Sequence, residues 1–154
     1  MTAPQRTRTG RVLTCRIPAT PHKLLNPNTS RISQAERAKL DWPLPMKTSN
    51  VIKFALRREL REATMLAAMN DRPAKPMAGP VVLRFVIAYE RGRKVLDFDN
   101  AIATLKGAID GLVDAGYMRD DDQVTGIYLE QIKDPAGQGY IDVCVEPVSS
   151  ERIA

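Results

Sequence analysis

Two aspartates separated by one residue are the first candidates for chemistry in this chain. Asp97 and Asp99 flank Phe98. In extended backbone, alternate side chains point to the same side, so we expect the two carboxylates to converge and Phe98 to point into the core. Two adjacent carboxylates repel each other, and a divalent cation removes that conflict. Ligand sets made only of oxygen favour Mg²⁺, Mn²⁺ or Ca²⁺ over zinc.

A lysine and a further aspartate follow on a predicted helix over residues 100–115. Its buried stripe is expected to be Ile102, Leu105, Ile109 and Leu112. Lys106 comes seven residues after Asp99, which puts both on nearly the same face of a continuous helix, away from that stripe. Asp110 lies almost on the same line, and we expect it to pair with Lys106 at i, i+4.

Three adjacent aspartates, Asp120, Asp121 and Asp122, come after that helix. Adjacent like charges are unfavourable unless something binds them, although a solvated turn before a strand explains them as well. An EF-hand loop is excluded, because a loop that starts at Asp121 has Ile132 instead of Glu at its twelfth position. The chain also has no Walker loop, no zinc-ligand spacing and only one histidine.

Charge is distributed very unevenly along the chain. Residues 1–96 contain 19 Lys and Arg and 6 Asp and Glu, whereas residues 97–154 contain 4 and 12, for a net charge of +5. A basic first part indicates a polyanionic partner such as nucleic acid, or solvated faces that merely differ in charge. The candidate DNA-binding side chains lie on a predicted helix and in the turn before Asp97: Lys53, Arg57, Arg61, Arg91, Arg93 and Lys94.

Dispersed carboxylates, a lysine and a basic surface together predict metal-dependent phosphodiester chemistry. A bound cation polarises the phosphoryl oxygen and activates a water. Lys106 would stabilise the charge that develops on the phosphate, and the basic first part would hold the rest of the nucleic acid. Two alternatives stay open: a nucleic-acid-binding protein that lacks catalysis, and a metal-dependent hydrolase of a small phosphate ester.

Four segments resemble a known nuclease family. They are Asp97-Phe98-Asp99-Asn100, Lys106-x-x-x-Asp110-Gly111-Leu112, Ala115-Gly116 and Asp120-Asp121-Asp122-Gln123-Val124. The pattern is similar to that of RusA-type Holliday junction resolvases, endodeoxyribonucleases of bacteria and their phages, and it covers about residues 95–125. The interval between Asp99 and Lys106 is longer than this family leads us to expect, and a looped-out start of the helix would compensate for it.

The resemblance implies a homodimer that cleaves two opposed strands of a four-way DNA junction, with Mg²⁺ or, in its place, Mn²⁺. The essential carboxylates of the family fall on Asp97, Asp99 and Asp121, which would also bind the metal. Its catalytic lysine falls on Lys106, and Asp120 is a lesser candidate.

The elements that must position these residues follow from the hydrophobic pattern. Strands are predicted over residues 11–17, 81–89, 124–133 and 140–146, with a hairpin turn over 134–139. A helix is predicted from Ser49 to about Asn70, with Ile52, Leu56, Ala63, Leu66 and Ala67 as its apolar positions. The β-α-β-α-β-β order predicts a single α+β domain, a mixed sheet with helices packed on it.

A length of 154 residues fits one domain. We expect a flexible basic arm over residues 1–10, the nuclease-like domain over 11–148 and a tail over 149–154. No apolar run is long enough to span a membrane, and no signal peptide is visible. Cys15 and Cys144 are therefore expected to be reduced core thiols of a cytoplasmic protein.

Overall fold

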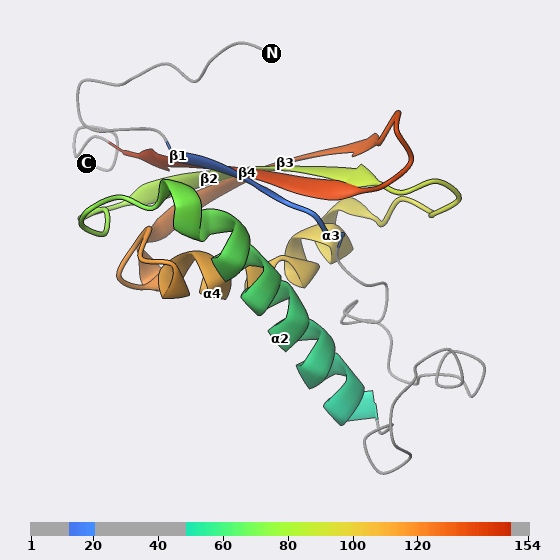
Figure 1. Cartoon of the computed structure of the whole chain (residues 1–154), viewed down its shortest axis with the longest axis horizontal. Helices are drawn as coiled ribbons and strands as arrows, with labels where there is room; N and C mark the ends of the chain where they lie inside the picture. Colours follow the sequence, from blue (N-terminus) through green and yellow to red (C-terminus); the bar gives the residue numbers. More distant parts are fainter. Residues whose placement is uncertain (1–12, 21–48, 149–154) are drawn as a thin grey trace.

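The computed structural model describes residues 13–20 and 49–148. They form a four-stranded mixed sheet with helices on one of its faces (Figure 1). The order along the chain is β1 (Leu13–Ile17), α2 (Ser49–Ala68), η3 (Met69–Asp71), β2 (Val81–Tyr89), α3 (Phe98–Thr104), α4 (Lys106–Asp114), η4 (Asp121–Gln123), β3 (Val124–Lys133) and β4 (Tyr140–Pro147). The predicted α+β class and element order are confirmed. The predicted arm and tail lie outside the described residues.

The sheet has the strand order β1-β4-β2-β3, which makes β2 a central strand and β3 an edge strand. β2 pairs in parallel with β3 and antiparallel with β4. A parallel pair needs a crossover connection, which α3 and α4 supply. The predicted hairpin is wrong, because the link over 134–139 passes across the end of β2. There the Asp134 N–H donates to the Tyr89 carbonyl (2.9 Å) and the Arg91 N–H to the Gly137 carbonyl (3.1 Å).

Alternating apolar residues bury one face of the sheet against the helices. The buried strand positions are Leu13, Cys15, Ile17, Val81, Leu83, Phe85, Ile87, Tyr89, Ile141, Val143 and Val145. They are the alternating apolar positions of the predicted strands, as expected for a sheet with one buried face. Both cysteines are free thiols, but only Cys15 is in the core as predicted, because Cys144 lies half-buried on the other face of the sheet. Burial raises the pKa of each thiol to about 11.

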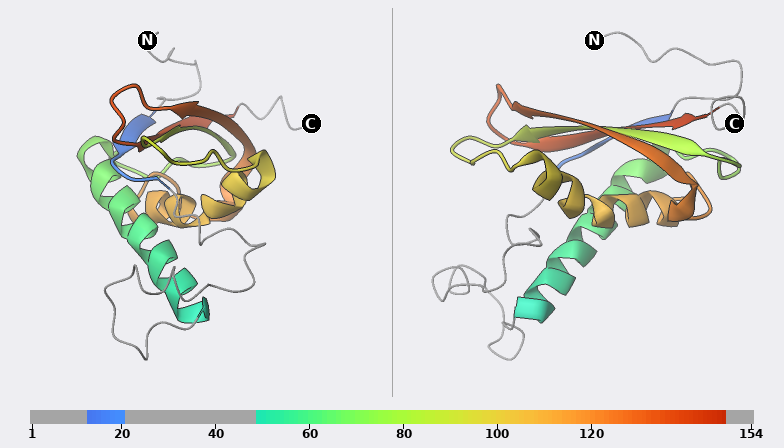
Figure 2. Two further views of the ribbon diagram at one scale, coloured as in Figure 1. Left: turned by 90° about the vertical axis from the view of Figure 1, so that its right-hand side faces the viewer. Right: turned by 180° about the vertical axis from the view of Figure 1, so that it is seen from behind.

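Helix α2 lies with its C-terminal part under the sheet, while its N-terminal part extends beyond it (Figure 2). The fully covered positions repeat every four residues and are Leu56, Leu60, Thr64 and Ala68. Leu56 and Leu66 were both expected on the apolar side of the helix. Leu56 is buried there, but Leu66 is 64% exposed. Two residues correspond to about 200° around a helix, so Leu66 faces away from the Thr64 side that packs inward. Among the described helices, none is long and apolar enough to cross a membrane.

Two glycines on α4 allow it to approach α2 closely. A Cβ on Gly107 would lie 2.8 Å from the Arg57 carbonyl oxygen. A Cβ on Gly111 would lie 2.5 Å from the Arg61 carbonyl oxygen and 2.6 Å from the Thr64 Cβ. No side chain fits in that space, so the helices meet backbone to backbone at these positions.

The crossover is two helices, where one continuous helix over 100–115 was predicted. Leu105, with φ −84° and ψ −1°, separates α3 from α4, and its N–H donates to the Ile102 carbonyl (3.1 Å), three residues back. The end of α4 at Asp114 agrees with the predicted helix end near residue 115, and Gly116 follows it with φ +82°. Its N–H donates to the Val113 carbonyl, and the N–H of the next residue reaches the Leu112 carbonyl.

We predict that Gly111→Ala destabilises the protein, although alanine favours helix more than glycine by about 1 kcal/mol. The added Cβ forces α2 and α4 apart, so the free energy of unfolding should fall by about 1–3 kcal/mol. Urea denaturation measures this change. Gly126→Ala is the control, because its Cβ would meet only the Val82 side chain at 3.5 Å, an ordinary contact. Wild-type stability in Gly111→Ala would refute the close-approach argument.

Candidate active site

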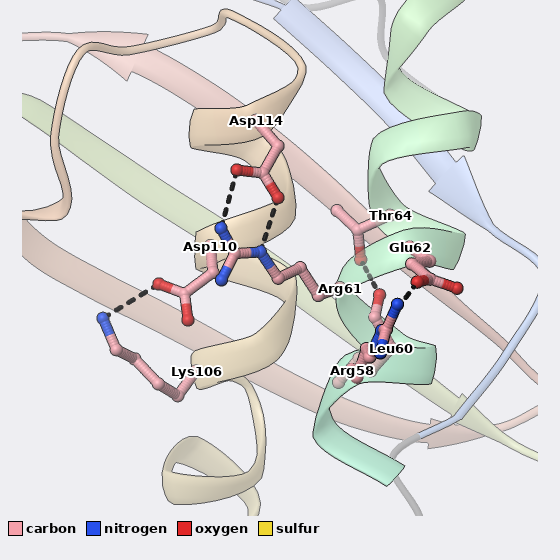
Figure 3. Close-up of polar contacts among 8 residues, drawn as sticks. All are labelled: Arg58, Leu60, Arg61, Glu62, Thr64, Lys106, Asp110 and Asp114. Atoms are coloured by element: carbon pink, nitrogen blue, oxygen red, sulfur yellow. Dashed lines mark hydrogen bonds and ion pairs between the residues drawn. The ribbon is translucent and has the colours of Figure 1, made fainter. Parts of the chain in front are cut away.

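The predicted lysine contacts one of the three predicted carboxylates. Lys106, the first residue of α4, forms an ion pair with Asp121, the first residue of η4, across 15 positions of the chain. It also pairs with Asp110 at 3.0 Å, as the i, i+4 spacing predicted (Figure 3). The fold therefore holds one ammonium group between two carboxylates.

These contacts fix the charge state of the lysine and of Asp121. Hydrogen bonds to Asp121 and then to Asp110 raise the pKa of Lys106. The hydrogen bond from Lys106, followed by one with Asp120, lowers the pKa of Asp121. Both groups are charged at neutral pH. Lys106 can thus donate hydrogen bonds to an anionic oxygen, but a protonated amine cannot act as a base.

Asp97 and Asp99 lie at the start of α3. Asp97 precedes the helix in extended backbone (φ −59°, ψ 148°), whereas Asp99 is in its first turn. The expected extended geometry thus holds for Asp97 alone. Phe98, expected in the core, is 54% exposed because it is the first residue of the helix and not part of a strand. Both carboxylate side chains are exposed.

The predicted metal ligands do not form one group in this structure. Within residues 13–20 and 49–148, no three Asp, Glu, His or Cys side chains lie close enough together to hold a metal ion. Asp97 and Asp99 lie at the start of α3, whereas Lys106, which contacts Asp121, begins α4 on the other side of the break at Leu105. The donors have the oxygen chemistry that suits Mg²⁺ but not the required proximity, and the set of Asp97, Asp99 and Asp121 stays a prediction.

Asp120 has a structural contact. Its side chain accepts from the backbone N–H of Gln123, and the Gln123 side chain bonds back to the Asp120 backbone, which is a capping box at η4. This reciprocal contact gives Asp120 a structural role that requires no bound metal ion. Asp121 and Asp122 are the exposed acids that follow it.

A groove of about 580 Å³ lies between α2 and α4. Its lining residues are Phe54, Arg57, Arg58, Arg61, Glu62, Met65, Asp110 and Asp114. Arg61 does not point freely into it, because Nε and Nη2 donate to the Asp114 carboxylate at 2.5 and 2.8 Å (Figure 3). The groove also includes Asp110, the ion-pair partner of Lys106.

The other predicted DNA-binding residues differ in exposure. Arg91 and Lys94 are exposed in the link between β2 and α3. The Arg93 side chain is only 16% exposed, donates to Thr20 Oγ1 (2.5 Å) and pairs with Glu90. Lys53 is half-buried on α2.

Sequence reasoning missed Arg58, which lines the groove and pairs with Glu62 at 3.0 Å. The doubled arginine at positions 57 and 58 was the available signal.

Comparison of the chain with protein-family models gave no match, and comparison with curated proteins gave none either. The lysine is held between two carboxylates, and one of these, Asp110, also lines the groove that has arginines along one wall.

We predict that Lys106→Met raises the pKa of Asp121, because the main cause of its depression is removed. In the wild type, the stabilisation from this depressed pKa is present above the unfolded value of 3.8 and is lost as the pH falls through the lower folded value. The variant should lose this acid dependence. NMR titration of the Asp121 carboxyl carbon measures the shift, with Lys94→Met as the control. An unchanged titration in Lys106→Met would show that the ion pair is absent in solution.

Proposed function

We propose that this protein is a structure-selective, Mg²⁺-dependent DNA endonuclease that resolves four-way junctions in recombination and repair. The observation that carries the proposal is the contact of Lys106 with Asp121 across the α4–η4 junction. In phosphodiester hydrolysis, negative charge grows on the phosphoryl oxygens, and a fixed ammonium group stabilises it. Mn²⁺ would also support activity when it is supplied in place of Mg²⁺. The protein would act in the cytoplasm.

In this proposal each of the chain's own site residues has a separate role. Lys106 would donate a hydrogen bond to the scissile phosphate, in exchange for one of its carboxylate contacts. Asp97, Asp99 and Asp121 would supply the oxygen ligands for the cation, which requires their segments to come closer together than they are here. The groove beside α2 would receive the flanking phosphates through Arg57 and Arg58.

We propose that the active form is a homodimer. A four-way junction with two-fold symmetry requires two cuts at opposed positions. A two-fold dimer presents one copy of the site to each strand, because the symmetry of the protein then matches that of the DNA.

We predict that the protein linearises a supercoiled plasmid that extrudes a cruciform, when Mg²⁺ is present. Linear product requires paired cuts, whereas a single cut gives a nicked circle. Asp97→Asn, Asp99→Asn, Asp121→Asn and Lys106→Ala should each lower the rate by at least about 100-fold. Junction binding should stay near the wild-type level, because none of these side chains is needed to hold the arms.

Asp122→Asn is the control, since it removes a neighbouring exposed acid to which no role is assigned. Wild-type turnover in Asp97→Asn or Asp121→Asn would overturn the site. A wild-type protein that binds junctions but cleaves nothing with Mg²⁺ or Mn²⁺ would be a nucleic-acid-binding protein of this fold, which is the alternative function.

We predict that binding depends on phosphate contacts from Arg57 and Lys94. Each neutralised phosphate contributes about −0.9 to the slope of log affinity against log salt concentration. Arg57→Gln and Lys94→Gln should each weaken junction binding and reduce that slope by about 0.9, as measured by fluorescence anisotropy at several salt concentrations. Arg84→Gln is the control, because Arg84 pairs with Glu146 on the face of the sheet opposite the helices. An equal loss in the control would contradict the proposed path of the DNA.

A further inference from the structure

Gln123 connects the acidic turn to a distant part of the main chain. Its Oε1 accepts the backbone N–H groups of Arg119 (2.7 Å) and Asp120 (3.1 Å). Its Nε2 donates to the carbonyls of Met77 (2.8 Å) and Gly79 (2.7 Å). A glutamine amide has two acceptor sites and two N–H donors, so its hydrogen-bonding capacity is filled by backbone groups alone.

Gln131 makes the corresponding connection for the segment before Asp97. Its Nε2 donates to the Leu96 carbonyl at 3.1 Å, and its Oε1 accepts the Tyr89 hydroxyl at 2.6 Å. Burial raises the pKa of Tyr89, which keeps that hydroxyl protonated and able to donate. Leu96 is the residue directly before Asp97, so this amide holds the stem of the segment that carries Asp97 and Asp99.

These two segments need such anchors. Residues 93–97 belong to no helix or strand, and the run of three aspartates is repulsive within itself. The anchored carbonyls are 46 and 44 positions away from Gln123, and 35 from Gln131. Gln123 directly precedes β3 and Gln131 lies within it, and β3 pairs in parallel with β2 from Val81 to Tyr89, with one irregularity between Val81 and Val82. One strand thus provides a common frame for both acid-bearing segments.

We propose that Gln123 and Gln131 are positioning residues of the nuclease site. Gln123 sets the position of Asp121, and Gln131 sets the position of Asp97 and Asp99. The inference rests on the proposed function for its catalytic consequence. The anchoring itself rests on the hydrogen bonds above.

Glutamate is the sharpest substitution at both positions, because it keeps the shape and the acceptor oxygens but removes the N–H donors. In Gln123→Glu, a carboxylate oxygen faces the carbonyls of Met77 and Gly79. In Gln131→Glu, it faces the Leu96 carbonyl, while the Tyr89 hydroxyl can still donate. Gln138→Glu is the matched control, since Gln138 is exposed in the link between β3 and β4.

The first measurement is cleavage of a four-way junction at varied junction and Mg²⁺ concentrations. Loss of a residue that orients metal ligands typically costs about 10–100-fold in metal affinity or activity. We expect Gln123→Glu and Gln131→Glu to lower kcat by at least about tenfold and to raise the Mg²⁺ concentration for half-maximal rate. KM for the junction should be unchanged, and the control should match wild type. Wild-type kcat and Mg²⁺ dependence in both variants would overturn the proposal.

The second measurement is backbone hydrogen exchange, followed by mass spectrometry, which does not depend on activity. Gln131→Glu should speed exchange around residues 94–98 and leave residues 119–122 as in wild type. Gln123→Glu should speed exchange around residues 119–122 and leave residues 94–98 as in wild type. Faster exchange throughout the chain would mean general destabilisation and would overturn the proposal. A wild-type protein that does not cleave would overturn the proposed function, and the exchange pattern would then decide the anchoring separately.

Discussion

The backbone contact between α2 and α4 determines where the candidate site residues lie. Gly107 and Gly111 have no side chains, so α4 lies against the carbonyl groups of α2. At this distance Arg61 reaches across to Asp114 with two hydrogen bonds. The first residue of the same helix, Lys106, is then placed where it meets Asp121. A wider helix pair would move the lysine and the groove beside it together.

Ion pairs between the two parts of the chain partly neutralise its uneven charge. Cations of the first part pair with acids of the second part: Arg16 with Asp142, Arg61 with Asp114 and Arg84 with Glu146. Arg16 and Arg84 also stack on the rings of Tyr140 and Tyr128. Among the described residues, part of the positive charge of the first part is therefore already paired, and exposed cations lie on α2 and in the link before Asp97.

The candidate site combines one contact that periodicity predicts with others that it cannot. Lys106 and Asp110 meet because four residues of helix bring side chains together. Lys106 and Asp121 meet because η4 folds back toward α4. Gln123 holds this turn through hydrogen bonds to main-chain carbonyls 44 and 46 positions earlier in the chain. Asp97 and Asp99 belong to a separate short helix, because the buried Leu105 interrupts the crossover. Their distance from Asp121 depends on that interruption.

The sequence by itself determined the strands, their buried faces, the extent of α2 and the glycine end of α4. Each of these depends on neighbours within a few residues, where alternation, helical spacing and backbone freedom act directly. Only the tertiary structure decided that β4 lies between β1 and β2, that Leu66 is exposed, and that Lys106 contacts Asp121. These features depend on which surfaces pack together, and a pattern of local spacing does not record contacts between residues far apart in the chain.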